Sequence, residues 1–75
     1  MPKLPRVNAR EIIRVLRRDG WDVEGSVGSH LRLGHPRKPG KVTVPFHAGR
    51  TIGPKLLKSI LDQADLTADE FQRLR

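Results

Sequence analysis

The spacing of apolar residues changes twice along this chain, and that change restricts the fold more than any other feature. Near the N-terminus apolar residues recur at the spacing of a helix with one buried side. In the middle they alternate with polar residues, as in a strand with one buried face. Toward the C-terminus the helical spacing returns. The pattern predicts an α+β fold that runs helix, strands, helix.

The first helix is predicted over Ala9–Asp19. Asn8 and Glu11 have the spacing of a capping box, in which the side chain of each residue accepts a hydrogen bond from the backbone N–H of the other. Gly20 is well placed as the C-terminal cap, and the two arginines shortly before it put positive charge where the helix dipole favours it.

Three short strands are predicted next. In the first strand Trp21 and Val23 alternate with polar residues. This strand is short, because glycines at 25 and 28 interrupt the alternation. The second covers Ser29–Leu33. A turn rich in proline and glycine, Gly34–Gly40, leads into the third strand, Lys41–Val44. The two longer strands should form a hairpin.

Alternation along this hairpin separates a buried face from an outer face. The buried face takes Leu31, Leu33, Val42 and Val44, and the outer face takes His30, Arg32, Lys41 and Thr43.

A loop is predicted over Phe46–Gly53, and Pro54 suits the first turn of a second helix. Thr67 and Glu70 repeat the capping-box form ahead of a short terminal helix that folds back on the core. The apolar stripe of the second helix is Leu56, Leu57, Ile60, Leu61 and Ala64. A chain of 75 residues with no internal repeat and no linker is expected to form one domain over residues 1–75.

Charge points to a polyanionic partner. Fifteen lysines and arginines against eight acidic residues leave a formal net charge of +7, which favours binding to nucleic acid phosphates. A merely soluble basic protein, or one with an acidic protein partner, is the alternative. With no cysteine, no apolar signal segment and no long apolar run, the chain is expected in the cytoplasm, with no membrane contact.

The outer face carries the candidate chemistry. Imidazole is the side chain best suited to proton exchange at neutral pH, so His30 could exchange protons with an RNA 2′-hydroxyl or a leaving oxygen, while neighbouring cations stabilise charge on phosphorus. The alternative is a surface histidine on a sheet that binds RNA passively. The predicted RNA-binding residues around the catalytic His30 are Ser29, Arg32, Arg37, Lys38 and Lys41.

The other two histidines receive different interpretations. His35 precedes a proline in a turn and is predicted to be a solvated loop residue. His47 follows the end of a strand and could turn toward the outer face or cap the second helix. The histidines lack the close carboxylates or thiolates of a metal site, so we expect no metal and no cofactor.

The motifs Gly20-Trp21, Gly28-Ser29-His30 and Val42-Thr43-Val44-Pro45 with His47, followed by Leu57–Leu61 with Ala64 and Phe71, resemble the HicA (YcfA-like) toxin family of HicAB toxin–antitoxin systems. The resemblance spans nearly the whole chain. It implies a fold like the double-stranded-RNA-binding domain, with a three-stranded antiparallel sheet backed by two helices. It also implies an mRNA interferase whose catalytic histidine is His30.

The resemblance further implies a HicB antitoxin, whose N-terminal domain covers the active face while its C-terminal domain binds operator DNA. One departure stands out. Family members often carry an Arg-Gln pair shortly before Gly-Ser-His, where this chain has Gly25-Ser26. An RNA contact is therefore expected to be missing, with more effect on affinity or preference than on chemistry.

The resulting prediction is an endoribonuclease toxin that cuts mRNA with His30 and is neutralised by a HicB-type antitoxin. The main alternative is a non-catalytic RNA-binding domain of the same fold. Direct DNA binding is not expected, because no helix and tight turn precede either long helix to present it to a major groove.

Overall fold

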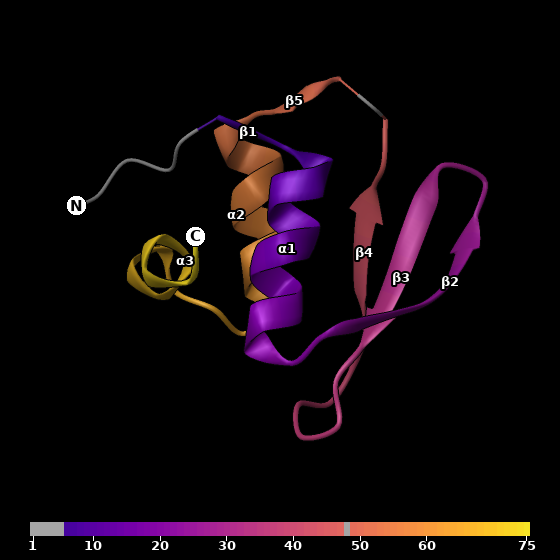
Figure 1. Cartoon of the computed structure of the whole chain (residues 1–75), viewed down its shortest axis with the longest axis vertical. Helices are drawn as coiled ribbons and strands as arrows, with labels where there is room; N and C mark the ends of the chain where they lie inside the picture. Colours follow the sequence, from indigo (N-terminus) through magenta and orange to yellow (C-terminus); the bar gives the residue numbers. More distant parts are fainter. Residues whose placement is uncertain (1–5, 48) are drawn as a thin grey trace.

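The computed structural model describes residues 6–47 and 49–75. A sheet forms one layer and the two longer helices lie side by side against one of its faces, while the third helix lies beyond them (Figure 1). The elements in chain order are β1 (Val7–Asn8), α1 (Ala9–Asp19), β2 (Asp22–Val27), β3 (His30–Gly34), β4 (Val42–Pro45), β5 (Thr51–Ile52), α2 (Pro54–Gln63) and α3 (Ala68–Leu74).

The predicted α+β class is confirmed. The main sheet has three antiparallel strands in the order β2-β3-β4, which is compatible with the arrangement of the double-stranded-RNA-binding domain. The second strand and the third each start one residue later than predicted, at His30 and at Val42.

Helix α1 has the predicted bounds and the predicted caps. The side chain of Asn8 accepts from the backbone N–H of Glu11 at 2.9 Å, and Gly20 ends the helix in the left-handed region with φ +109°. Only half of the capping box is observed, because the Glu11 carboxylate accepts from the Arg75 guanidinium. The Glu11 carboxylate, which the local sequence assigned to the capping box, therefore binds Arg75 at the C-terminus instead.

Strand β2 is longer than predicted. It passes through Gly25 to Val27, and its pairing with β3 shifts between Val23 and Gly25, which is a bulge. The extra residue lets the strand continue past the glycine that was predicted to end it. Its far end is exposed, because the helices do not reach it.

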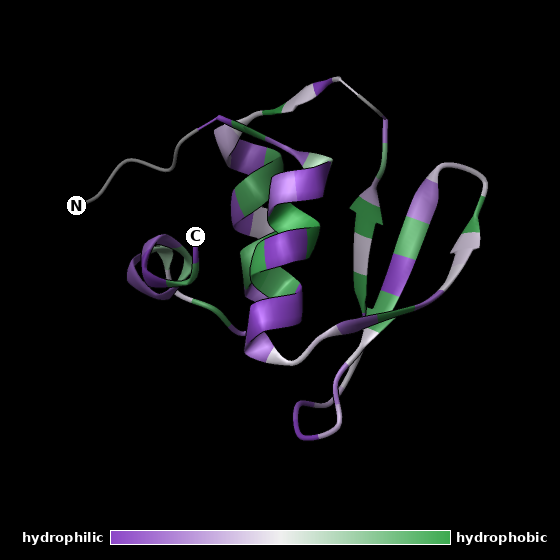
Figure 2. Cartoon of the chain, in the orientation of Figure 1, coloured by the Kyte–Doolittle hydropathy of each residue, from purple (hydrophilic) through white to green (hydrophobic). Residues whose placement is uncertain are grey.

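The core lies between the sheet and the helices. Leu33, Val42 and Val44 are fully buried from the sheet side, while His30 and Arg32 are exposed, so the predicted division of the faces is confirmed. Figure 2 shows green apolar positions on both α1 and α2, with those of α1 on the side toward the sheet. The buried helix residues are Ala9, Ile12, Val15, Leu16, Leu57, Ile60 and Leu61.

Two details of the C-terminal half differ from prediction. Thr51–Ile52, predicted as loop, forms β5 and pairs with β1 in a separate two-stranded sheet. Leu56, predicted in the buried stripe of α2, is 41% exposed and lines a cavity together with Ala9 and Ile52.

Helix α3 is confirmed as a capped helix that folds back on the core. Thr67 and Glu70 form both bonds of the capping box, at 3.1 and 2.9 Å. Phe71 is fully buried, and the Arg18 side chain donates to the carbonyl of Leu74 at 2.7 Å. Backbone hydrogen bonding from Thr67, and then its side chain, lowers the pKa of Glu70.

Candidate nucleic-acid interface

The Gly28-Ser29-His30 motif forms the turn of the β2–β3 hairpin. Val27 pairs with His30 across the turn, so only two residues connect the strands. Gly28 has φ +59°, a left-handed conformation that glycine adopts without steric strain and that two-residue hairpins require. The turn therefore places His30 at the first position of β3, with its side chain exposed.

Two apolar neighbours flank His30 on the outer face. Val27 is its partner on β2 and Pro45 is its partner on β4. Val27 is 80% exposed, the most exposed of the large apolar side chains in the described part of the chain. A histidine open to solvent between two apolar residues can be reached by a substrate or covered by a partner protein.

Ser29 links this turn to the segment that follows β4. Its carbonyl accepts from the backbone N–H of Phe46 at 2.6 Å, and its hydroxyl lies 3.4 Å from Nε2 of His47. The second contact is at the long end of hydrogen-bonding range. His47 is thus turned toward the residue beside His30, in agreement with the first of its two predicted placements.

His47 also lines a cavity of about 140 Å³ beside the hairpin turn. This cavity joins residues that are far apart in the sequence: Ala9, Pro45, His47, Arg50, Thr51, Ile52 and Leu56. Sequence reasoning did not single out Arg50, although it lies three positions after His47 and its backbone N–H donates to the His47 carbonyl at 3.1 Å.

The remaining outer-face cations lie where the alternation predicted. Arg32 is exposed opposite Thr43, and Arg37 is exposed in the turn after β3. Lys41 is exposed and its ammonium lies 2.6 Å from the Glu24 carboxylate. A surface pair of this kind is worth ~1 kcal/mol or less, so Lys41 can exchange it for a phosphate.

Lys38 differs from these cations because its ammonium is already bound within the protein. Nζ donates to Asp19 Oδ2 at 2.7 Å and to the carbonyls of Ala64 and Asp65 at 3.0 and 3.2 Å. These bonds use all three of its donors. Lys38 therefore joins the hairpin turn to the C-terminal ends of α1 and α2, and it has no donor left for RNA in this conformation.

The interpretation of His35 as a solvated loop residue is wrong. Its ring is half-buried and contacts Trp21 edge to face, with centroids 5.1 Å apart. Nδ1 accepts from the backbone N–H groups of Arg37 and Lys38, so Nε2 must carry the proton that it donates to the Asp19 carbonyl at 2.7 Å. His35 is a structural residue, which sequence reasoning missed because its partner Asp19 is 16 positions away.

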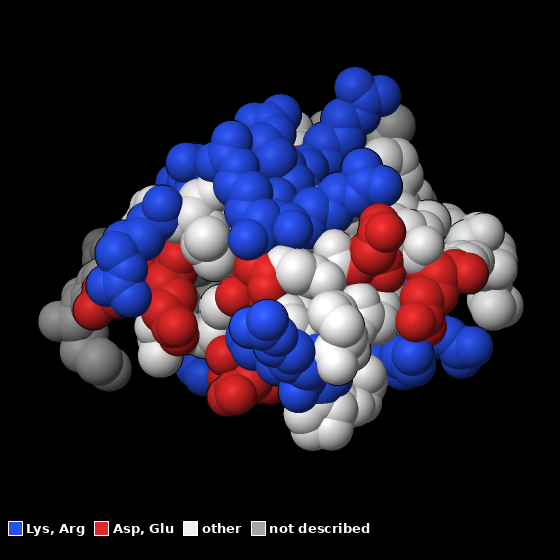
Figure 3. Space-filling model, turned by 60° about the horizontal axis from the view of Figure 1, so that its bottom comes forward, with Lys and Arg blue, Asp and Glu red and all other residues white. Residues whose placement is uncertain are grey.

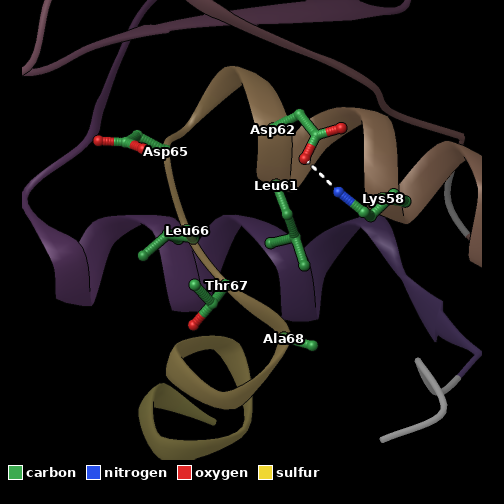
Figure 4. Close-up of a pocket in the computed structure, with 7 residues that line it drawn as sticks. All are labelled: Lys58, Leu61, Asp62, Asp65, Leu66, Thr67 and Ala68. Atoms are coloured by element: carbon green, nitrogen blue, oxygen red, sulfur yellow. Dashed lines mark hydrogen bonds and ion pairs between the residues drawn. The ribbon is translucent and has the colours of Figure 1, made fainter. Parts of the chain in front are cut away.

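Another cavity, of about 370 Å³, lies between α2 and α3 (Figure 4). Lys58 and Asp62 form an ion pair at its edge, and Leu61 points into it, whereas the Leu66 side chain points away from Leu61. Asp62 and Asp65 are unfavourable neighbours for a phosphate, so this cavity does not fit the proposed substrate.

Two further findings concern the described residues, 6–47 and 49–75. They contain no group of three or more His, Cys, Asp or Glu side chains that could hold a metal ion. Their helices are all too short or too polar to cross a membrane.

The fold and this site together define a class: a small α+β protein like the double-stranded-RNA-binding domain, with an exposed histidine among cations on the free face of its sheet. A family model described as the HicA toxin of bacterial toxin–antitoxin systems matches residues 9–66. The chain belongs to this toxin family, and membership implies an antitoxin partner. No curated protein matches the chain significantly.

The match places α1 through α2 within the family domain and leaves α3 outside it.

The outer face also contains the position at which this chain departs from the family's Arg-Gln pair. Gly25, where the family often has arginine, pairs with Arg32 of β3. An arginine there would sit beside Arg32 on the outer face.

Proposed function

We propose that this toxin is an endoribonuclease, an mRNA interferase that cuts RNA on the outer face of its sheet with His30 as general acid or base. The observation that carries the proposal is the exposed His30 at the Gly-Ser-His turn, in a member of the HicA toxin family. Arg32 follows two positions later on the same face, and Arg37 and Lys41 lie at the turn that follows the other end of β3.

The chemistry needs a base, a phosphorus electrophile and an acid. His30 takes the proton of a ribose 2′-hydroxyl, the 2′-oxygen attacks the adjacent phosphorus, and the 5′-oxygen leaves with a proton from an acid. The products are a 2′,3′-cyclic phosphate and a 5′-hydroxyl. Arg32 stabilises the charge that develops on the phosphorus oxygens, and the Ser29 hydroxyl can donate a hydrogen bond to them. Lys41 lies four residues before Pro45, the partner of His30, so it would hold a phosphate further along the RNA strand.

His47 is our candidate for the second proton-transfer group. It contacts Ser29, the residue before His30, and it lies two positions beyond Pro45, the cross-strand partner of His30. A base and an acid that act together produce a bell-shaped dependence of kcat/KM on pH. The His47→Ala variant should cut RNA more slowly and lose one limb of that bell.

The test of the function is the His30→Ala variant. We expect it to lose RNA cleavage and growth arrest while its melting temperature stays within about 3 °C, because the side chain is exposed and makes no hydrogen bond to another described side chain. A folded variant that still cuts RNA would refute the assignment of His30. A wild type that binds RNA but never cuts it would favour the non-catalytic RNA-binding domain.

A second experiment tests the cleavage route. Cleavage should persist in EDTA, and a substrate with a single 2′-deoxyribose at the scissile position should resist it, because its nucleophile is missing. Dependence on magnesium, or equal cleavage of the deoxy substrate, would contradict the use of the 2′-hydroxyl.

The antitoxin is proposed to be a HicB-type protein that covers the outer face in the cytoplasm, where mRNA is available. Val27 beside His30 offers an exposed apolar contact, and the surrounding cations suit an acidic partner. Such a partner would block His30 directly. Replacing Val27 with aspartate should weaken neutralisation of the toxin in a growth assay with the antitoxin co-expressed.

A further inference from the structure

Helix α1 carries a row of arginines on its solvent side. Four of its eleven residues are arginines, and all four are exposed. At 3.6 residues per turn, Arg10, Arg14 and Arg17 lie within about 60° of one another around the axis and span ~10 Å along it. We call these three residues the α1 arginine row. Figure 3 shows a broad cluster of Lys and Arg side chains at the top of the view, with carboxylates along its lower border and other Lys and Arg side chains apart from it.

Of the three residues in the row, only Arg17 helps the helix to form, because it lies in the last turn, where the dipole favours a cation. Arg10 lies in the first turn, where the helix dipole disfavours a cation. Arg10 and Arg14 are four positions apart, a like-charge spacing that costs a few tenths of a kcal/mol. The presence of these arginines is therefore better explained by a ligand than by stability.

The guanidinium groups are available to a ligand. In the described part of the chain, neither Arg10 nor Arg14 takes part in an ion pair. Arg17 lies 3.3 Å from Asp22 and remains 61% exposed, which makes it a weak surface pair. Arg18 is excluded from the row, because it bonds to the carbonyl of Leu74.

One end of the row lies close to the proposed cleavage site. Ala9, the residue before Arg10, lines the same cavity as His47 and Arg50. His47 in turn contacts Ser29, next to His30. Arg50 therefore lies at the same cavity as His47 and the start of α1, which adds a cation near both.

The composition of this surface favours nucleic acid over protein. Protein interfaces have an apolar centre, often with aromatic residues. The exposed large apolar residues of the described chain are Val23, Val27 and Leu56, and none of them lies on α1. Arginines alone suit phosphates, which accept paired hydrogen bonds from the planar guanidinium.

We propose that the α1 arginine row, continued by Arg50, binds the phosphate backbone of RNA outside the segment being cut. This inference rests on the proposed RNA substrate. A span of ~10 Å matches about three phosphates at about 3.4 Å per nucleotide of a stacked strand. The toxin would then bind long RNA more tightly than short RNA without reading more of its sequence.

The test replaces Arg10, Arg14 and Arg17 together with glutamine, which keeps helix propensity. Binding of a 5-nucleotide and a 30-nucleotide RNA is measured in the His30→Ala background between 50 and 200 mM salt. For the long RNA, the slope of log affinity against log salt should fall by about 2, since each phosphate contributes about 0.7. Binding of the short RNA should be unchanged.

The matched control replaces Lys55, Lys58 and Arg73 with glutamine, which removes the same charge from exposed positions elsewhere. This variant should change the long-RNA slope by less than half as much. Equal effects of the two triple variants would overturn the proposal, since they would reflect net charge alone. Unchanged RNA binding with lost antitoxin neutralisation would also overturn it, in favour of a protein interface.

Cleavage of the short RNA with His30 intact separates this proposal from the proposed function. The arginine-row variant should cut the short RNA at the wild-type rate. If the wild type cuts neither RNA, the proposed function fails, whereas the salt slopes still decide whether the row binds RNA.

Discussion

Replacing His35 with alanine should destabilise the fold without touching the proposed chemistry. The ring fills the space between Trp21 and the end of α1, and it supplies the hydrogen-bond partner of the Asp19 carbonyl and of two backbone N–H groups of the turn. Alanine removes all of these contacts and leaves the carbonyl with no donor from this side chain.

The magnitude follows from the contacts. The Nε2 bond is worth about 1 kcal/mol, the two bonds to Nδ1 together about 1 kcal/mol, and the edge-to-face contact with Trp21 about 1 kcal/mol. A loss of about 3 kcal/mol is a large part of the ~4–11 kcal/mol expected for a domain of this length. The melting temperature should fall by roughly 12–24 °C.

A double-mutant cycle with Gly20 tests whether the ring position is right. A Cβ on Gly20 would lie 2.6 Å from Nε2 of His35, and Gly20 has φ +109°. Gly20→Ala should therefore cost both left-handed strain and a clash with the ring. In the His35→Ala background only the strain of about 1–2 kcal/mol should remain.

The assay is a thermal melt followed by circular dichroism, with His30→Ala as the control that removes an exposed imidazole. A drop of less than about 3 °C for His35→Ala would refute a structural role, since it corresponds to under ~1 kcal/mol for a domain of this size. Additive costs in the cycle would refute the contact between the ring and Gly20.

Three further predictions concern single positions. Gly25→Arg should fold normally, because a Cβ at this position meets nothing within 4 Å. The new cation beside Arg32 should strengthen RNA binding and raise the slope of log affinity against log salt by about 0.7. An unchanged slope would contradict the location of residue 25 in the RNA-binding face. The pKa of Glu70 is lowered in the folded protein, so its capping bonds stabilise the fold fully above the ordinary glutamate pKa of about 4.3. This stabilisation is lost as the pH falls through the lower pKa of the folded state. Glu70→Gln should therefore flatten the dependence of melting temperature on pH between about 5 and 3. Lys38→Met should lower the melting temperature more than Lys41→Met, because only Lys38 bonds two backbone carbonyls, and equal losses would return Lys38 to the RNA-binding set.

Local sequence determined the elements whose signals lie within a few residues. The caps of α1 and α3 depend on side chains three positions apart, and the exposed side of β3 follows from alternation, so Asn8, Thr67 and His30 were placed correctly. The Gly28 turn is equally local, since a two-residue connection needs a left-handed residue. The catalytic role of His30 and the RNA-binding roles of its neighbours stay predictions.

Only the tertiary structure decided which charged and polar groups are free to meet a ligand. Lys38 and Arg37 are adjacent in the sequence and look alike there, yet Lys38 bonds to Asp19 and Ala64, which lie 19 and 26 positions away. The structural role of His35 and the contact of His47 with Ser29 likewise depend on partners that are distant in the sequence. Periodicity reports which side of its own element a residue faces, whereas a side chain's partner depends on how distant elements pack.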